Sequence, residues 1–445
     1  MKRYEAYDSF LDIWVNEIPA HWKTHKMKYL FHERSEKGYP DEPLLVASQN
    51  MGVVPKKVYG NRTAEAQKDL HLLKLVRVDD FVISLRSFQG GLEYAYYQGI
   101  ISPAYTVLTP HEPITAGYFR YLAKSKLFIG LLTLCVTGIR EGQNIDYEKL
   151  RNHSLPVPPR TEQDQIVRYL DWQVSKINRL IAAKRKRIEL VKEHFSVRIA
   201  NIVCNGLKPN TPMRETGIDY IGAIPSHWTV LQNKRLFKSM NRTFQGIPTV
   251  LSLSQKDGLI PYSEMTERSL HTSSYENWQL VCPNDLVLNR FKAHLGVFFA
   301  SKYTGIVTFH YGVYEAKMPL VAKYYEVLYH TPEYCRVYAG QSRGMTVGLQ
   351  NLSDTNFYST YTVYPPNEEQ REIVTEIEQN EKQQSSIIAG VNRQIEKLQE
   401  FRTRLISDVV TGQVDVRGIE VPEYEAVQDM TEEQEEESEK IVEDE

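Results

Sequence analysis

The chain has few cysteines: only Cys135, Cys204, Cys282 and Cys335 occur among its 445 residues. They stand far apart and form no Cys-x-x-Cys pair, so the sequence predicts neither a zinc site nor a disulfide framework. Long apolar runs are also lacking, because the longest, LFIGLLTLCV (127–136), is far short of the roughly 20 residues of a membrane-spanning helix. The first residues, MKRYEAYDSF, lack the apolar segment of a secretory signal. These absences favour a cytoplasmic location without a membrane partner.

The sequence motifs of common enzymes are missing as well. The chain has no GxxxxGK(S/T) phosphate loop, GxGxxG, HExxH or GxSxG motif. The proline pairs in VPPR (157–160) and YPPN (364–367) lack the Asn-Pro-Pro-Tyr-like tetrad expected of an amino-methyltransferase acting on DNA. A metal-dependent nuclease is disfavoured, because the E-x-K that follows Asp285 lies about thirty positions away. The histidines do not cluster, and His21 and His227 are interpreted as packing and turn residues. We therefore predict no catalytic residue, no metal site and no cofactor in this chain.

The net charge of −3 hides an uneven distribution. Residues 420–445 hold thirteen Asp and Glu and one Lys, a net charge of −12, whereas residues 1–419 hold 43 acidic and 52 basic residues, a net charge of +9. So acidic a segment repels itself and is predicted to be disordered. It could dock on a basic partner or serve solubility alone. The basic remainder is compatible with a polyanionic partner.

The chain is an internal duplication. The pentapeptide IPAHW (18–22) returns as IPSHW (224–228), 206 positions later, and further matches follow at offsets of 205 to 207. Each half therefore opens with IPxHW and closes with PP-x-x-E-Q. The further matches are SQNMGVVP (48–55) with SQKDGLIP (254–261), DFV (80–82) with DLV (285–287), GII (99–101) with GIV (305–307), Tyr105 with Tyr311, GQN (142–144) with LQN (349–351), and VPPRTEQDQIV (157–167) with YPPNEEQREIV (364–374).

After each PP, one frame with alternating steps of four and three collects apolar residues, which is typical of a coiled-coil seam. Each helix would run for about 40 residues, or about 60 Å. An exposed seam of that length is unstable in water, so we expect the two helices to pair with each other. Glu381 and Gln384 are polar positions of the frame, interpreted as fixing the register or facing a partner. The apolar seam positions are Leu170, Val174, Ile177, Ile181, Ile188, Val191, Phe195 and Ile202, then Ile377, Ile388, Val391, Ile395, Leu398, Leu405 and Val409.

The two intervening regions are predicted to be globular and of mixed α and β structure. Strand-like segments are DDFVISLR (79–86), NDLVLNRF (284–291) and IVTFHYGVYEAKM (306–318). Helix-like segments are AGYFRYLAKSKLFIGLLTL (116–134) and KYYEVLYHT (323–331).

The duplicated plan resembles the specificity subunit of type I restriction–modification enzymes. The likeness rests on the two IPxHW openings, the two PP-x-x-E-Q segments with their long helices, GIISPAYTVL (99–108), PMRETGIDYIGAIPSHW (212–228) and the helix ends KEHFSVRIANIVCNGL (192–207) and IEKLQEFRTRLISDVVTGQVDV (395–416). It covers about residues 1–418, and only the acidic extension falls outside it.

The resemblance implies an α+β fold of two similar mixed α/β target-recognition domains, joined by two long antiparallel coiled-coil helices with internal pseudo-twofold symmetry. The expected segments are a first recognition domain (1–157), a first spacer helix (158–207), a linker with the second recognition domain (208–364), a second spacer helix (365–418) and a disordered acidic tail (419–445).

The resemblance further implies a non-catalytic DNA-specificity subunit. Each recognition domain would read one half of a bipartite site on double-stranded DNA, and the helical pair would set the spacing. Two methyltransferase (modification) subunits and a restriction (motor-nuclease) subunit would be partners, and these partners, not this chain, would bind S-adenosylmethionine, ATP and Mg.

Base edges in the major groove are read by Arg, Lys, Gln and Asn side chains on loops. Equivalent positions in both halves, such as Gln49 with Gln255 and Asn144 with Asn351, are better suited to structural or backbone contacts than to sequence reading. The candidate DNA-binding residues are Gln49, Lys56, Lys57, Arg86, Gln89, Arg140, Gln143 and Asn144 in the first half, and Gln255, Lys256, Arg290, Lys292, Arg343, Gln350 and Asn351 in the second.

Two other functions stay open at this point. One is a coiled-coil adaptor without DNA binding, and the other is a stand-alone DNA-modifying enzyme with an unrecognised site. Steep weakening of DNA binding with salt would distinguish DNA binding from the adaptor, because contacted phosphates release counterions.

Overall fold

The structure is a computed structural model and describes residues 2–10, 12–49, 51–59, 69–84, 87–137, 144–244, 249–254, 258–265, 275, 277–342 and 351–424. The chain divides into two compact units. Unit 1 consists of residues 1–186 and 391–445, and unit 2 of residues 187–390. Each unit therefore combines the globular region of one half with parts of two long helices.

Each unit contains a four-stranded antiparallel sheet of the same strand order. In unit 1 the order is β4 (Phe31–Arg34), β11 (Thr106–Pro110), β8 (Phe81–Ile83) and β9 (Glu93–Tyr94). In unit 2 it is β18 (Phe237–Ser239), β25 (Tyr311–Ala316), β22 (Leu286–Asn289) and β23 (Phe298–Ala300). The sequence repeat is thus a repeat of topology, and the predicted mixture of helix and strand is confirmed.

Four strand pairs of unit 1 also have counterparts in unit 2, whereas β12–β13 has none among the described residues. The unit 1 pairs are β1 (Tyr7–Ser9) with β2 (Glu17–Pro19), β3 (Lys23–Lys26) with β14 (Ser154–Val157), β5 (Leu45–Ser48) with β6 (Gly52–Pro55), β7 (Lys74–Val76) with β10 (Gly99–Ile101), and β12 (Val136–Thr137) with β13 (Asn144–Ile145). The unit 2 pairs are β15 (Met213–Glu215) with β16 (Ala223–Pro225), β17 (Thr229–Gln232) with β26 (Tyr361–Tyr364), β19 (Leu251–Ser254) with β20 (Gly258–Pro261), and β21 (Gln279–Val281) with β24 (Gly305–Val307).

Each unit also contains short helices. Those of unit 1 are α1 (Lys56–Tyr59), α2 (Ser87–Gly90), α3 (Ala116–Leu122), α4 (Lys126–Leu134), α5 (Tyr147–Leu150) and the 3-10 turns Met27–Tyr29 and Leu70–Leu72. Those of unit 2 are α7 (Asn233–Leu236), α8 (Ala322–Tyr329), α9 (Pro332–Gln341), α10 (Asp354–Ser359) and the 3-10 turns Tyr262–Glu264 and Arg290–Leu295. Helix α8 packs against β22 and β23.

Two predicted elements are divided in the structure. The helix expected over 116–134 is two helices, because the Ser125 hydroxyl accepts a bond from the Phe128 N–H and so caps a new helix, α4. The strand expected over 306–318 is β24 followed by β25, since Thr308 to His310 form a turn in which Tyr311 N donates to Thr308 O.

The two long helices predicted from the sequence are confirmed. Helix α6 runs from Arg160 to Asn205 and α11 from Asn367 to Val410, about 69 and 66 Å at 1.5 Å per residue. Both end before a glycine with positive φ, Gly206 at 81° and Gly412 at 75°, a left-handed conformation that stops a helix. The helical part of the region 365–418 therefore ends at Val410. In the part of the chain that the structure describes, no helix is long and apolar enough to cross a membrane.

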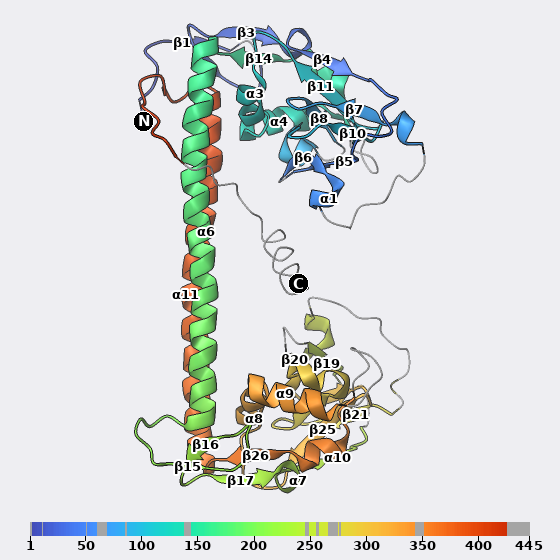
Figure 1. The fold of residues 1–445 in the computed structure, drawn as a ribbon, viewed down its shortest axis with the longest axis vertical. Coiled ribbons are helices and arrows are strands. Elements are labelled where there is room, and N and C mark those ends of the chain that lie inside the picture. Colours follow the sequence, from blue (N-terminus) through green and yellow to red (C-terminus); the bar gives the residue numbers. More distant parts are fainter. Residues whose placement is uncertain are drawn as a thin grey trace. The chain divides into compact units, whose positions relative to one another are not determined.

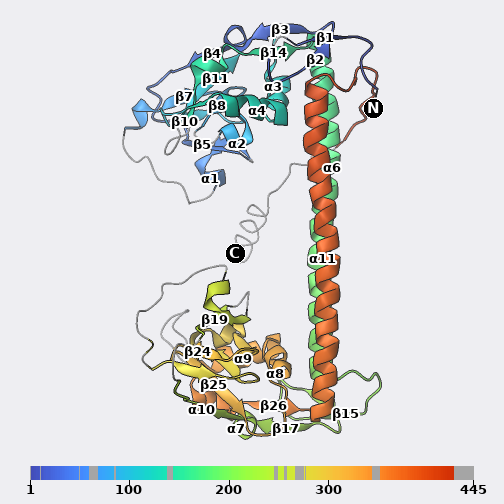
Figure 2. The ribbon, with the colours of Figure 1, turned by 180° about the vertical axis from the view of Figure 1, so that it is seen from behind.

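Within each unit a segment of α6 lies beside a segment of α11, as both views show (Figures 1 and 2). In unit 1, Asn178 bonds to Arg402 and Lys184 to Gln394, so the α11 number falls as the α6 number rises. The segments are therefore antiparallel there. The same is true in unit 2, where Lys192 faces Gln384 and Arg198 faces Glu376.

Aromatic rings fill much of each core. In unit 1, Phe119 lies 4.5 Å from Phe31 and 4.7 Å from Phe81 between ring centroids, and all three are buried. In unit 2, buried tyrosines dominate, with Tyr329 and Tyr338 packed on Phe298. Such large apolar surfaces stabilise each unit around its own core.

Candidate functional site

The IPxHW motif of unit 1 contacts the PP-x-x-E-Q motif of the same half. His21 Nε2 lies 2.7 Å from Glu162 Oε2, and Trp22 Nε1 donates to Glu162 Oε1 at 3.0 Å. The Tyr4 hydroxyl donates to the same Oε1 at 2.5 Å. Trp22, Tyr4 and Glu162 are all buried. One carboxylate in the first turn of α6 therefore holds three side chains of the N-terminal segment.

Unit 2 repeats this contact between the IPxHW motif and the glutamate of PP-x-x-E-Q, which we call the joint of each unit. His227 Nε2 lies 2.8 Å from Glu369 Oε2, and Trp228 Nε1 donates to the same oxygen at 3.0 Å. The interpretation of the histidines as packing and turn residues missed the glutamates. The glutamate of PP-x-x-E-Q recurs in both halves, so its importance could have been predicted from the sequence. The sequence does not indicate which side chains it contacts.

The glutamine of each PP-x-x-E-Q motif ties the long helix to a short one. Gln163 Nε2 donates to Pro158 O, and its Oε1 accepts from Thr115 N, both at 2.9 Å. Thr115 is the N-cap residue of α3. Gln370 does the same in unit 2, where its Oε1 accepts from Val321 N, at the N-cap of α8, at 2.9 Å. The start of each long helix is thus fixed on its own globular region.

The end of each long helix accepts a hydrogen bond from a buried tyrosine of the other half's globular region. The buried Tyr118 hydroxyl of unit 1 donates to Val410 O, at the end of α11, at 2.7 Å. The buried Tyr324 hydroxyl of unit 2 donates to Val203 O, near the end of α6, at 2.8 Å. The globular region of each half therefore contacts the end of the long helix that belongs to the other half, and the two contacts are reciprocal.

The fifteen apolar seam positions are buried or half-buried. Ten of them are buried, and Val174, Ile188, Val191, Ile388 and Leu398 are half-buried.

Besides Glu381 and Gln384, the frame of steps of four and three has three more polar positions, Lys184, Arg198 and Arg402. All five make a polar contact with a neighbouring element, and four of them contact the facing helix. Such polar contacts specify register at some cost in stability. The contacts are Lys184 Nζ to Gln394 Oε1 (2.6 Å) and Arg402 Nη1 to Asn178 Oδ1 (2.7 Å) in unit 1, and Arg198 Nη2 to Glu376 Oε1 (3.0 Å), Gln384 Nε2 to Lys192 O (3.5 Å) and Glu381 Oε1 to Lys323 Nζ of α8 (4.0 Å) in unit 2.

Five candidate DNA-binding residues of unit 1 lie within the described residues. Gln49 follows β5, Lys56 and Lys57 begin α1, Gln89 is in α2 and Asn144 is in β13. All are exposed except Lys56, which is half-buried. They thus come from four separate segments of the chain.

Lys124 connects two of these segments and was not predicted. Its Nζ donates to Gln49 O at 3.1 Å, to Gly90 O of α2 at 2.9 Å and to Glu93 Oε2 at 2.7 Å. Glu93 is fully buried, and its Oε1 has no hydrogen-bond partner among the described residues. Burial raises the pKa of Glu93 to about 7, although the Lys124 ammonium lowers it. Lys124 thereby positions the segments that carry Gln49 and Gln89, a role that only the fold reveals.

Three candidates of unit 2 are described. Arg290 Nη2 lies 2.7 Å from Asp354 Oδ1, and Arg290 O accepts from Leu352 N at 3.0 Å. That contact brings Arg290 close to Asn351, the residue before Leu352. Lys292 and Asn351 are exposed, so these two present polar groups to solvent, whereas part of the Arg290 guanidinium is used inside the unit.

The remaining candidates lie outside the described residues. They are Arg86, Arg140 and Gln143 of the first half, and Gln255, Lys256, Arg343 and Gln350 of the second.

The repeated Asp of each half is an internal partner of an arginine. Asp80 Oδ2 accepts from Arg34 Nε at 2.9 Å, and Asp285 Oδ2 accepts from Arg242 Nη1 at 2.5 Å. Both aspartates are buried, and buried charges of this kind need such a partner. Among the described residues, no three His, Cys, Asp or Glu side chains could together hold a metal ion.

Comparison with solved structures finds the same fold. The chain is similar to a chain of a structure described as the structural basis of complex assembly and conformational transition of the type I R-M system, with 13% identity and a TM-score of 0.62 over 89% of this chain and 99% of that one. The HsdS subunit of Thermoanaerobacter tengcongensis (13% identity, TM-score 0.47, 89% and 98% covered) and the type I restriction-modification S subunit of M. genitalium (10%, 0.31, 87% and 96%) also match. No protein-family model and no curated protein sequence matches.

Proposed function

We propose that this chain is the DNA sequence-specificity subunit of a type I restriction–modification system. The observation that carries the proposal is the shared fold over 89% of the chain with a component of such a system. The two sheets of equal strand order, whose sequences differ outside the matched motifs, support it, because two related but unlike surfaces suit two unlike half-sites. In this proposal each unit reads one half of a bipartite site on double-stranded DNA.

The paired helices would act as an antiparallel coiled-coil spacer. Their lengths of 46 and 44 residues and the polar contacts between them support a fixed register. Two readers mounted on such a spacer could contact half-sites about one helical turn apart, roughly 34 Å, on one duplex. The spacer would then determine how many base pairs lie unread between the two halves.

The chain would not catalyse a reaction by itself. Its partners would be two adenine-methylating modification subunits, which would bind S-adenosylmethionine, and a restriction subunit, which would use ATP and Mg. The repeated joints around Glu162 and Glu369 are equivalent in the two units, which supports two equivalent docking places for the modification subunits.

The test is co-expression of the chain with type I modification subunits, followed by purification and footprinting. We expect a stable complex that protects a split sequence, and methylated adenines in both halves of that sequence in the host genome. A chain that stays alone and protects nothing contradicts the proposal. Purified chain with Mg or S-adenosylmethionine, and no partner, should leave DNA unchanged.

Point variants test the DNA contacts. Lys57→Ala in unit 1 and Lys292→Ala in unit 2 remove exposed cations of the candidate loops. If each contacts a phosphate, the complex binds all sequences more weakly and the slope of log affinity against log salt falls by about 1. Lys397→Ala, which removes an exposed cation from α11, is the matched control. An equal loss in the control would show a general charge effect instead.

A further inference from the structure

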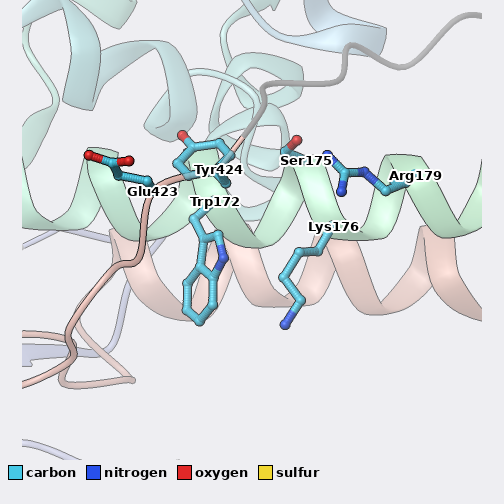
Figure 3. Close-up of a pocket in the computed structure, with 6 residues that line it drawn as sticks. All are labelled: Trp172, Ser175, Lys176, Arg179, Glu423 and Tyr424. Carbon is cyan, nitrogen blue, oxygen red and sulfur yellow. The ribbon is translucent and has the colours of Figure 1, made fainter.

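The segment that follows α11 folds back onto α6 within unit 1. Gln165 Nε2 donates to Val416 O at 3.0 Å and to Ile419 O at 2.7 Å. Four and five residues further on, Glu423 and Tyr424 border a cavity of about 510 Å³ on α6. The other residues that line it are Trp172, Ser175, Lys176 and Arg179 (Figure 3). The segment thus contacts α6 at increasing residue numbers as it approaches residue 424.

The cavity combines a flat apolar surface with cations. Lys176 Nζ lies 4.7 Å from the centroid of the Trp172 ring, and both Lys176 and Arg179 are exposed. Tyr424 lines the same cavity as these α6 residues and is 38% exposed. The described chain therefore ends at a positively charged surface of α6.

Beyond the cavity, Lys186 adds a further exposed cation to the same face of α6. Residues 172–186 hold five Lys and Arg and no Asp or Glu. Residues 425–445, which lie outside the described residues, hold eleven Asp and Glu and one Lys, a net charge of −10. These 21 residues could span about 70 Å when extended, whereas residues 179 to 186 of the helix occupy about 10 Å. A long polyanion is therefore tethered beside a short polycation.

We propose that residues 425–445 bind in cis to the basic surface of α6, defined as the exposed residues Lys176, Arg179 and Lys186, and exclude other polyanions from it. The occupant is this chain's own acidic tail, because the chain delivers it to the cavity and the charges are complementary. The tether keeps its effective concentration high. That the excluded polyanion is DNA rests on the proposed function, but the binding of the tail does not.

The first experiment measures the tail alone. A fluorescent peptide of residues 425–445 is titrated with the full chain and with a chain that ends at Tyr424, and anisotropy is recorded. We expect the truncated chain to bind the peptide at least fivefold more tightly than the full chain, whose own tail occupies the surface. Binding should weaken at least tenfold between about 50 and 300 mM salt, because it depends on charge.

Variants of the truncated chain locate the binding surface. Lys176→Gln combined with Arg179→Gln should weaken peptide binding at least threefold. Arg393→Gln combined with Lys397→Gln removes two exposed cations from α11 of the same unit and should leave it within a factor of two. The inference is overturned by equal peptide affinity of the full and truncated chains, or by an equal loss in the α11 variant.

The second experiment asks whether the tail excludes DNA. A duplex of arbitrary sequence should bind the truncated chain about three to tenfold more tightly than the full chain at about 100 mM salt, and the free peptide should reverse the gain. Equal DNA affinity of the two chains overturns the exclusion. DNA affinity in neither chain overturns the proposed function instead, and binding of the tail is then decided by the peptide titration alone.

Discussion

Replacement of Glu162 by alanine is expected to destabilise unit 1 strongly. The carboxylate accepts from Tyr4 and Trp22, whose exposed fractions are 5% and 6%, so neither donor can turn to water. Each unsatisfied buried donor costs about 1–3 kcal/mol, and the lost side chain leaves a cavity. The unfolding free energy of unit 1 should therefore fall by about 3–5 kcal/mol.

The substitution Glu162→Gln should recover more than half of this loss. Tyr4 and Trp22 both donate to the same oxygen, Oε1, and the amide oxygen of glutamine can replace it. Glu369→Ala should cost less, about 1–3 kcal/mol, because His227 is 49% exposed and keeps access to water, so that only Trp228 loses its partner.

The assay is urea unfolding followed by tryptophan fluorescence, with segment-resolved amide hydrogen exchange to assign each loss to its unit. The exposed neighbour Glu368→Ala is the control and should stay within about 0.5 kcal/mol of the parent chain. The reasoning is refuted if Glu162→Ala also stays within that range, or if its effect appears in unit 2.

Three further outcomes follow from the ends of the long helices and from the buried acid. Tyr118→Phe and Tyr324→Phe should each cost about 1–2 kcal/mol in urea unfolding, since each removes a buried bond to a helix end and Tyr118 also loses its bond to Pro156 O. A loss in only one of the two variants would contradict the equivalence of the two contacts. Gly412→Ala should lower the melting temperature more than Gly206→Ala, because a Cβ would lie 2.3 Å from the Pro19 ring in the first case and 3.0 Å from a glutamate oxygen in the second. Because the pKa of Glu93 is raised from 4.5 to about 7, the folded state keeps a proton that the unfolded chain loses between these two pH values. The unfolding free energy should therefore fall by up to about 3 kcal/mol between pH 4.5 and 7 and stay level above pH 7. Glu93→Gln should remove this dependence on pH, and an unchanged dependence would exclude Glu93 as its cause.

Much of the architecture could be predicted from the sequence because its signals are periodic or repeated. Apolar residues in steps of four and three indicated α6 and α11, since each helical turn presents the same face again. The offset of 206 indicated two like globular regions. Helix ends were also within reach, because Gly206 and Gly412 occupy equivalent places and take the conformation that stops a helix.

The partners of the functional groups were not predictable, because they lie far apart along the chain. Tyr118 meets Val410, and Lys124 meets Gln49, and nothing local to either residue specifies such a contact. The short strands were predicted only in part. A three-residue strand has too few alternating apolar and polar residues to establish the strand order or the pairing register.

The sequence by itself determined the duplication, the two long helices and the motifs that open and close each half, because these depend on spacing along the chain. Only the tertiary structure decided that each long helix ends against the other half's globular region, that a glutamate joins the Trp and His of each opening motif, and that the segment before the acidic tail lies on a basic surface of α6. The physical reason is that spacing is a property of the chain alone, whereas contacts between residues more than a hundred positions apart exist only once the chain has packed.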